Sequence, residues 1–390
     1  MKLHHLAPWF LCLVAIGCTR TVQVKKGTIV SQDATGKPDV LRQKIGQLLL
    51  MGFDGTSIQD QGVQDILHSI SRGEVGGVIL FRHNITGPAQ LKQLMKALRT
   101  AVPQGFPDLF VAIDQEGGKV CRMSSQNGFT DFPSPKQMAQ QNLQDACSSI
   151  AKLVAEYGFN VNFTPVVDLD LYNAQGSVIG GLERSFSPDP QIVIQYAAQC
   201  IKAHQKEGVL PVEKHYPGHG SAKGNTHEGY VNVTDDWQPQ ELLPYKQLHE
   251  MGLLAAVMTA HVVNRNVDLL PASLSRVHIQ DMLREKIGHQ GLVFSDDLQM
   301  GAVSGRYELA HVARMGMHAG VDVLVFSNNP LACRGVETLK YGPRVQPKQV
   351  VDAIEQHIFE GDDTLRQRVE ESYQRVVRVK ESLKRQKNRI

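Results

Sequence analysis

Eight short apolar runs, separated by stretches with helical periodicity, constrain the fold of this chain more than any other feature. The runs are continuous rather than alternating, which is typical of parallel strands that are buried on both faces. They cover residues 47–53, 75–81, 109–114, 159–168, 209–215, 254–261, 291–296 and 321–327. Eight strands that alternate with helices predict an α/β fold, and the simplest such architecture is a single (β/α)8 barrel of the TIM type.

An open, doubly wound sheet is the alternative arrangement of the same elements. Such a sheet usually carries a glycine-rich nucleotide fingerprint after its first strand. The sequence LLLMGFDGTS at residues 48–57 has no such fingerprint. A chain of 390 residues suits one barrel domain, which we place at residues 41–390.

The N-terminus has the pattern of an export signal. Its apolar run, Trp9 to Gly17, is far shorter than the roughly 20 residues that a membrane-spanning helix needs. We predict a signal peptide over residues 1–17 and a polar lead-in over residues 18–40. The sequence AIGC resembles a lipobox, so Cys18 is the predicted lipidation site, and an ordinary cleaved signal is the alternative. The prediction is an exported protein, lipid-anchored in the bacterial cell envelope.

Charge and cysteine content limit the partners of the chain. The net charge is +2 and there is no long basic run, so nothing indicates a nucleic-acid partner. Outside the signal region four cysteines remain, at irregular spacing: Cys121, Cys147, Cys200 and Cys333. They form no C-x-x-C pattern, so we expect buried free thiols, although export would permit disulfides.

The segment KHYPGHGSAKGNTHEGY at residues 214–230 is rich in His and Gly. His215 and His219 have the spacing of two ligands on a helix, but Pro217 between them is incompatible with a helix interior. No Cys or Glu at a recurring ligand spacing lies nearby, so a metal site is the weaker hypothesis. GHGSAKGN also fails to match the phosphate-binding loop. We therefore expect no metal and no cofactor, and we interpret the segment as a mobile loop with a titratable side chain.

Polar residues follow several of the predicted strands. In a barrel the carboxyl ends of the strands meet at one mouth, where the chemistry takes place. The residues in question are Asp114, Lys214, His215, His261 and Asp296. Two carboxylates and a flexible His suit glycoside hydrolysis. Metal-assisted hydrolysis would require His after the first strand, and Schiff-base chemistry would require a desolvated Lys, for which Lys214 is the candidate.

Five motifs in order carry a resemblance to a known family. They are AIDQEGGKVCRM, IGGLERSFSPDP, EKHYPGHG followed by NTH, PASLS, and VFSDDLQM. Together they resemble the single-domain bacterial β-N-acetylhexosaminidases of glycoside hydrolase family 3, which remove N-acetylglucosamine from peptidoglycan fragments. The resemblance implies an exo-acting β-N-acetylglucosaminidase that retains configuration, with an amino-sugar glycan or muropeptide as substrate.

The resemblance also implies roles for individual residues. Asp296 matches the nucleophile that forms a glycosyl-enzyme, and His227 matches the acid/base on a mobile loop. Asp297 would cap the next helix or brace the turn. The positions that match sugar-binding residues are Asp114, Arg122, Arg184, Lys214 and His215. For Arg184 the alternative is a structural ion pair with Glu183, and His261 could equally be a core histidine.

One position of the catalytic loop departs from the family pattern. The family has Asp two residues before the acid/base His, and this chain has Asn225 there. An Asn can orient the ring, but it cannot offset an imidazolium charge, and the same exchange in a serine-hydrolase triad costs roughly 10⁴ in kcat. Two alternatives stay open: a sugar-binding lipoprotein with weakened catalysis, and an N-acetylglucosaminide phosphorylase that uses phosphate in place of water.

Overall fold

The structure, a computed structural model, describes residues 40–143, 145–172 and 177–387. The predicted signal peptide, Cys18 and all but the last residue of the lead-in lie outside these ranges. Each of the eight predicted strands is present, and every paired strand runs parallel to its neighbour. The predicted α/β fold with parallel strands is therefore confirmed.

The strands form two main sheets. Six of them pair in the order β11-β1-β2-β3-β4-β5 and three in the order β10-β8-β6. The first sheet comprises β1 (Leu49–Met51), β2 (Gly77–Leu80), β3 (Phe110–Ile113), β4 (Val161–Asn162), β5 (Leu210–Pro211) and β11 (Leu324–Phe326). The second comprises β6 (Glu213–Tyr216), β8 (Ala256–Thr259) and β10 (Leu292–Ser295). Neighbouring strands follow the chain order, except where β11 returns to lie beside β1.

The two sheets touch at both of their ends. Only Val212 separates β5 from β6, so the run at 209–215 contributes to both sheets. Isolated parallel bridges join Val166 to Lys214 and Phe294 to Val323. A small parallel pair, β7 (Val231–Asn232) with β9 (Val262–Val263), connects the end of the His-rich loop to the segment after β8. This pair anchors the loop over the carboxyl ends of the second sheet.

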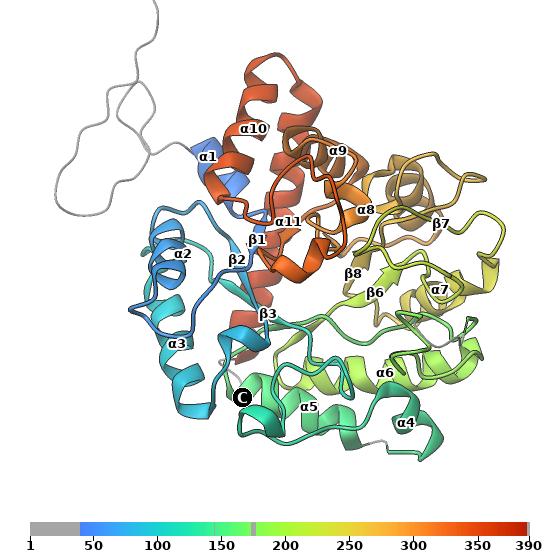
Figure 1. Ribbon diagram of the computed structural model, residues 1–390. Helices are drawn as coiled ribbons and strands as arrows, with labels where there is room; N and C mark the ends of the chain where they lie inside the picture. The colour runs from blue at the N-terminus through green and yellow to red at the C-terminus, as the bar shows by residue number, and fades with distance from the viewer. Residues whose placement is uncertain (1–39, 144, 173–176, 388–390) are drawn as a thin grey trace, which may run out of the picture.

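Helices lie outside the strands, with α2 and α3 on one side and α5 and α6 on another (Figure 1). The bounds are α1 Val40–Gly46, α2 Gln61–Ser71, α3 Pro88–Thr100, α4 Pro135–Gln140, α5 Asp145–Glu156, α6 Pro190–Lys206, α7 Leu243–Glu250, α8 Gly301–Ser304, α9 Leu309–Ala319, α10 Pro347–Phe359 and α11 Asp363–Lys387. A π-helix, η5, spans Val277–Lys286. None of the helices in the described ranges is both long enough and apolar enough to cross a membrane.

Local sequence explains where these helices begin and end. Pro190 opens α6, and the Asp189 carboxylate caps it by accepting from the Gln191 backbone N–H at 2.8 Å. Past the ends of α6 and α9, Gly208 and Gly320 have φ angles of 68° and 115°. Such angles favour glycine, which lacks the Cβ that makes this region costly.

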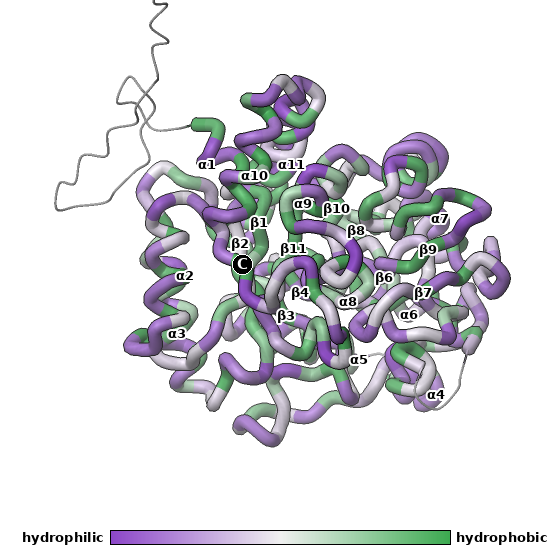
Figure 2. The backbone as a smooth tube through the Cα atoms, turned by 45° about the horizontal axis from the view of Figure 1, so that its top comes forward, coloured by the Kyte–Doolittle hydropathy of each residue, from purple (hydrophilic) through white to green (hydrophobic). Residues whose placement is uncertain are grey.

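Aromatic rings from both sheets meet in the core. The ring centroids of Phe110 on β3 and Phe294 on β10 are 6.2 Å apart, and Phe163, just after β4, lies 5.6 Å from Phe294. All three side chains are buried. Figure 2 shows hydrophobic residues concentrated along the central strands and hydrophilic residues along the outer turns. Because these buried rings come from both sheets and contact one another, the inner faces of the two sheets share one core.

The expectation of free thiols is wrong for two of the four cysteines. A disulfide joins Cys147 on α5 to Cys200 on α6, with the Cα atoms 4.9 Å apart. The bonded residues lie 53 positions apart in the sequence, and only the packing of the two helices brings them together. Cys121 and Cys333 are free and buried, as expected.

Candidate active site

All eight residues predicted to act in catalysis or sugar binding line one pocket. It has a volume of about 320 Å³ and lies at the carboxyl ends of the strands. Asp114 follows β3, Lys214 and His215 belong to β6, and Asp296 follows β10. The remaining four come from loops: Arg122 after β3, Arg184 after β4, and Asn225 and His227 after β6. Parallel strands place these segments at one edge because their carboxyl ends coincide.

Asp114 is held between two cations. Its Oδ2 accepts from Arg122 Nη2 at 2.9 Å, and its Oδ1 accepts from Lys214 Nζ at 2.9 Å. Burial alone would raise the pKa of Asp114, but the charges of Lys214 and Arg122 hold it well below its ordinary value. The carboxylate is therefore ionised near neutral pH, and it can accept hydrogen bonds from the hydroxyl groups of a ligand.

Glu116 was missed in the sequence analysis and lies at the centre of this cluster. It accepts both Nε (2.9 Å) and Nη2 (2.8 Å) of Arg184, and its Oε1 lies 2.7 Å from Lys214 Nζ. Burial opposes ionisation, yet Arg184 and Lys214 lower the pKa of Glu116 to about 2. The alternative pairing of Arg184 with Glu183 is wrong, because Glu183 instead accepts from the Ser134 hydroxyl. The signal in the sequence that could have identified Glu116 was its position in QEGG, two residues after Asp114.

Lys214 is suited to binding rather than to covalent chemistry. Its side chain is 3% exposed, and its ammonium contacts both Asp114 and Glu116. A nucleophilic Lys is activated by an apolar pocket or by a neighbouring cation, whereas this one has two anions. The geometry does not favour the Schiff-base hypothesis.

His215 is oriented by a second residue that the sequence analysis missed, Asp168. The His215 Nδ1–H donates to Asp168 Oδ2 at 2.6 Å, and its Nε2 accepts from Arg184 Nη2 at 3.3 Å, since a guanidinium can only donate. Asp168 also accepts the backbone N–H of His219 at 2.8 Å. Burial would raise the pKa of Asp168, but these contacts with His215 and His219 hold it below its ordinary value. Asp168 is the last residue of the fourth predicted strand, at 159–168. That position at a strand's carboxyl end was the signal in the sequence that could have identified it as a site residue.

Asp296 and Asp297 have different environments although they are neighbours. Asp296 Oδ1 accepts the backbone N–H of Asp297 at 2.8 Å, whereas Asp297 Oδ1 accepts those of Gln299 (3.1 Å) and Ser327 (3.0 Å). Burial raises the pKa of Asp297 to about 6. For Asp296 burial acts in the same direction, but nearby His261 and His215 and the Asp297 N–H lower its pKa. Asp297 braces the turn, as predicted, while Asp296 remains an ionised carboxylate in the pocket.

The His227 ring lies on the loop after β6 and is turned toward this pocket. Its Nδ1–H donates to Asn225 Oδ1 at 3.1 Å, and its backbone N–H donates to the same oxygen at 3.0 Å. Although the residue is exposed at the surface, the pocket walls on one side of the ring desolvate it, and Arg184 adds a positive charge. Asp296 opposes both effects, but the net result is a lowered pKa for His227. A neutral imidazole is therefore favoured near pH 7.

His261 is a core residue. Its Nε2–H donates to the Asp297 carbonyl oxygen at 2.9 Å, so its Nδ1 accepts from the Ser273 hydroxyl at 2.6 Å. The side chain is fully buried. Both ring nitrogens have partners, which is the pattern of a structural histidine next to the site.

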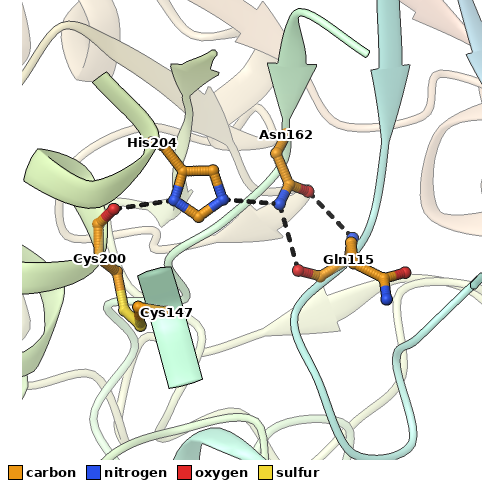
Figure 3. The surroundings of a disulfide bond; sticks show 5 residues. All are labelled: Gln115, Cys147, Asn162, Cys200 and His204. Atoms are coloured by element: carbon orange, nitrogen blue, oxygen red, sulfur yellow. Dashed lines mark hydrogen bonds between the residues drawn. A yellow bond between two sulfur atoms is a disulfide. The ribbon is translucent and has the colours of Figure 1, made fainter. Parts of the chain in front are cut away.

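Asn162 connects the segment after β3 to the rest of the fold. Its Oδ1 accepts the Gln115 backbone N–H at 3.0 Å, and its Nδ2 donates to the Gln115 carbonyl at 3.2 Å. A third contact joins Asn162 Nδ2 to His204 Nε2 at 3.0 Å, and His204 Nδ1–H donates to the Cys200 carbonyl at 2.8 Å. Figure 3 shows this row from the disulfide to Gln115, the residue between Asp114 and Glu116.

Among the described residues no three His, Cys, Asp or Glu side chains gather in a way that could hold a metal ion.

Comparison with known proteins fits this geometry. The family described as "Glycosyl hydrolase family 3 N terminal domain" matches residues 40–379. The chain belongs to glycoside hydrolase family 3. A relative from Nitrosomonas eutropha named Beta-hexosaminidase is 35% identical over 298 residues, which cover 72% of this chain and 81% of the relative. A protein of the same name from Neisseria meningitidis serogroup A is 37% identical over 275 residues, which cover 66% of this chain and 72% of that relative.

Solved structures of two enzymes, the first of them described as a member of glycoside hydrolase family 3, have the same fold. A β-N-acetylglucosaminidase from Paenibacillus sp. superposes with a TM-score of 0.75 at 29% identity, covering 88% of this chain and 62% of that one. This chain therefore spans somewhat less than two thirds of that protein. A β-N-acetylhexosaminidase from Beutenbergia cavernae superposes with a TM-score of 0.74 at 26% identity, covering 87% of this chain and 98% of its own. The protein is a glycoside hydrolase.

Proposed function

We propose that this protein is a retaining exo-β-N-acetylglucosaminidase that removes terminal β-linked N-acetylglucosamine from peptidoglycan-derived fragments. One observation carries the proposal: Asp296 and His227 line the same pocket as the Asp114–Lys214–Glu116–Arg184 cluster. The names of the relatives, Beta-hexosaminidase and β-N-acetylglucosaminidase, support the choice of sugar.

The cluster would bind the terminal sugar. Asp114 and Glu116 accept hydrogen bonds, while Arg122, Arg184 and Lys214 donate them, so the cluster can match the alternating donors and acceptors of sugar hydroxyls. Its groups are held by one another before substrate arrives, which limits the entropy lost on binding. A pocket of about 320 Å³ is at the lower end of ligand sites and suits a single terminal sugar.

In the first step Asp296 would attack C1 of the bound sugar. A bond forms between a carboxylate oxygen of Asp296 and C1, and the bond between C1 and the leaving oxygen breaks. The leaving oxygen takes its proton from Nε2 of protonated His227, because Nδ1 is occupied by Asn225. The products of this step are a glycosyl-enzyme and the released aglycone.

In the second step water would displace the Asp296 carboxylate from C1 of the sugar. Neutral His227 takes a proton from water as the water oxygen bonds to C1, and the ester bond to Asp296 breaks. The sugar leaves with its original configuration, since each step inverts C1 once. His227 is again protonated, and the cycle is complete.

The substrate prediction is tested with two chromogenic substrates. A nitrophenyl β-N-acetylglucosaminide should be hydrolysed and the matching β-glucoside should not, and proton NMR should show the β-anomer of the sugar first. A preference for the glucoside, or first appearance of the α-anomer, would contradict the proposal.

A phosphate acceptor is the second candidate, and Asn225 is the observation that favours it. A neutral amide would repel an incoming phosphate less than a carboxylate would. However, the carboxylate of Glu228 lies 3.0 Å from the Asn225 amide nitrogen, which restores a negative charge nearby. We therefore propose water as the acceptor; formation of sugar 1-phosphate in phosphate buffer would support the other candidate.

We also propose export with a lipid anchor on Cys18. The Cys147–Cys200 disulfide supports export, because such bonds form and persist in oxidising compartments outside the cytosol. Mass spectrometry of the protein from a bacterial host would test the anchor. The expected N-terminal residue is a lipid-modified Cys18, and an unmodified N-terminus at any other residue would contradict it.

Finally, we propose that the two sheets form one closed (β/α)8 barrel. The support comes from the shared run at β5 and β6, the bridge between Phe294 and Val323, and the aromatic core common to both sheets. An experimental structure with a continuous ladder of hydrogen bonds around all eight strands would test this proposal.

A further inference from the structure

Three side chains of the catalytic loop form a hydrogen-bonded row. Asn225 Oδ1 accepts from the backbone N–H and from Nδ1–H of His227, at 3.0 and 3.1 Å. At the other end of the same amide, Asn225 Nδ2 donates to Glu228 Oε1 at 3.0 Å. The row therefore runs from a carboxylate through a neutral amide to the imidazole that lines the pocket.

The orientation of the Asn225 amide is fixed at both of its ends. If the amide were reversed, its NH2 group would face two N–H donors of His227, and its carbonyl oxygen would face the carboxylate of Glu228. Both reversed contacts are repulsive, and the observed ones are favourable. Glu228 therefore selects the orientation in which a carbonyl oxygen faces His227 Nδ1–H.

We infer that Glu228 is a positioning residue for His227 and acts through the amide of Asn225. This inference rests on the proposed function, in which His227 is the acid/base. The row keeps the proton on Nδ1 in the neutral ring and leaves Nε2 for proton transfer. Because hydrogen bonds in a chain polarise one another, the negative charge of Glu228 also makes Asn225 Oδ1 a stronger acceptor. In this way a neutral residue at position 225 can still stabilise the imidazolium.

The charges around His227 make this contribution important. Desolvation and the positive charge of Arg184 oppose protonation of the ring, as do His261 and His215 when charged, whereas Asp296 favours it. Together they lower the pKa of His227, so the protonated ring that the first step needs is the minor form near pH 7. Any added negative charge should therefore help the first step, in which His227 gives up a proton.

The backbone of the loop holds the row in place. Gly301 N–H donates to the His227 carbonyl at 3.2 Å, and Ala302 N–H donates to the Thr226 carbonyl at 3.0 Å. A Cβ on Gly301 would lie 2.6 Å from that same His227 carbonyl oxygen, so only glycine permits this approach. The loop is thus attached to the start of α8, just after Asp296 and Asp297.

The test compares two leaving groups across a pH series. Nitrophenyl β-N-acetylglucosaminide needs little acid assistance, whereas methyl β-N-acetylglucosaminide needs much. For Glu228→Ala we expect kcat/KM with the methyl substrate to fall roughly tenfold, a small share of the 10²–10⁴ that general acid catalysis supplies. With the nitrophenyl substrate the loss should be about twofold or less. Glu228→Gln keeps an acceptor without the charge and should lie between Glu228→Ala and the wild type.

Two further variants separate positioning from folding. Asp235→Asn removes one exposed carboxylate from the segment after β7 and should leave both substrates unaffected. In an Asn225→Asp background the contact with Glu228 becomes repulsive, so the Glu228→Gln exchange should no longer reduce kcat/KM. A merely structural role for Glu228 would give the same loss in both backgrounds.

The outcomes distinguish this inference from the proposed function. No turnover by the wild-type protein, or equal turnover by Asp296→Ala, would overturn the proposed function and this inference with it. Wild-type turnover combined with a Glu228→Ala variant that shows equal losses for both leaving groups, or none, would overturn this inference alone.

Discussion

The ionisation states of Asp296 and His227 determine the pH at which the proposed first step can proceed. That step needs Asp296 ionised and His227 protonated. The pKa of His227 is lowered, first by desolvation, so the protonated fraction declines as pH rises through a value below the ordinary one of about 6.5. We expect the alkaline limb of the kcat/KM profile to lie below pH 6.5 and to move upward in Asn225→Asp, where an anion faces the ring. A limb above pH 7 in the wild type would contradict this account.

Lys214 is the residue whose loss should disturb the sugar site most. In Lys214→Met two buried carboxylates lose a shared partner, which should cost roughly 3 kcal/mol of unfolding free energy, as when one partner of a buried ion pair is removed. Binding of N-acetylglucosamine should weaken as well. The double variant Lys214→Met/Glu116→Gln should recover part of the stability in denaturant unfolding but none of the binding. Full recovery of binding would show that the cation is not needed.

At the scale of elements, the Asn162 side chain continues the contact between β3 and β4 beyond the carboxyl end of β3, at Gln115. Asn160 makes the equivalent contacts at the amino end, where its amide bonds the Val111 N–H at 2.7 Å and the Leu109 carbonyl at 2.9 Å. Both Asn side chains therefore bond backbone groups beside β3, at opposite ends of the strand, and only Asn162 lies next to the pocket residues and also contacts His204.

This pair offers a controlled experiment. Asn162→Ala and Asn160→Ala should each lower the unfolding free energy by roughly 2 kcal/mol, because each leaves backbone groups without partners. Only Asn162→Ala should raise KM, since Gln115 lies between Asp114 and Glu116. An equal change of KM in both variants would show that the effect is general destabilisation.

Strand positions were predictable from the sequence, and the pairing of side chains between strands was not. Continuous apolar runs locate the strands because burial on both faces requires such runs. Glu116 and Asp168 were missed because their partners, Arg184 and His215, are distant in the sequence and become neighbours only in the fold. The family motif therefore found the residues expected to touch the sugar but not the anions that hold them.

At the scale of the whole molecule, the disulfide between α5 and α6 should contribute to stability rather than to catalysis. Closing a loop of 53 residues restricts the unfolded chain and should be worth about 4 kcal/mol. Unfolding in denaturant should therefore occur at lower concentration after reduction, and Cys147→Ala/Cys200→Ala should unfold identically with and without reductant. If reduction left the wild-type transition unchanged, the bond would have no such role.

The proposed mechanism depends above all on attack by Asp296 on the sugar in this pocket. The most direct test is to inactivate the protein with a fluorinated N-acetylglucosaminyl fluoride that slows breakdown of the glycosyl-enzyme, and to map the adduct by mass spectrometry. We expect a single adduct on Asp296, and none on the Asp296→Ala variant. An adduct on another residue, or turnover with no covalent intermediate, would contradict it.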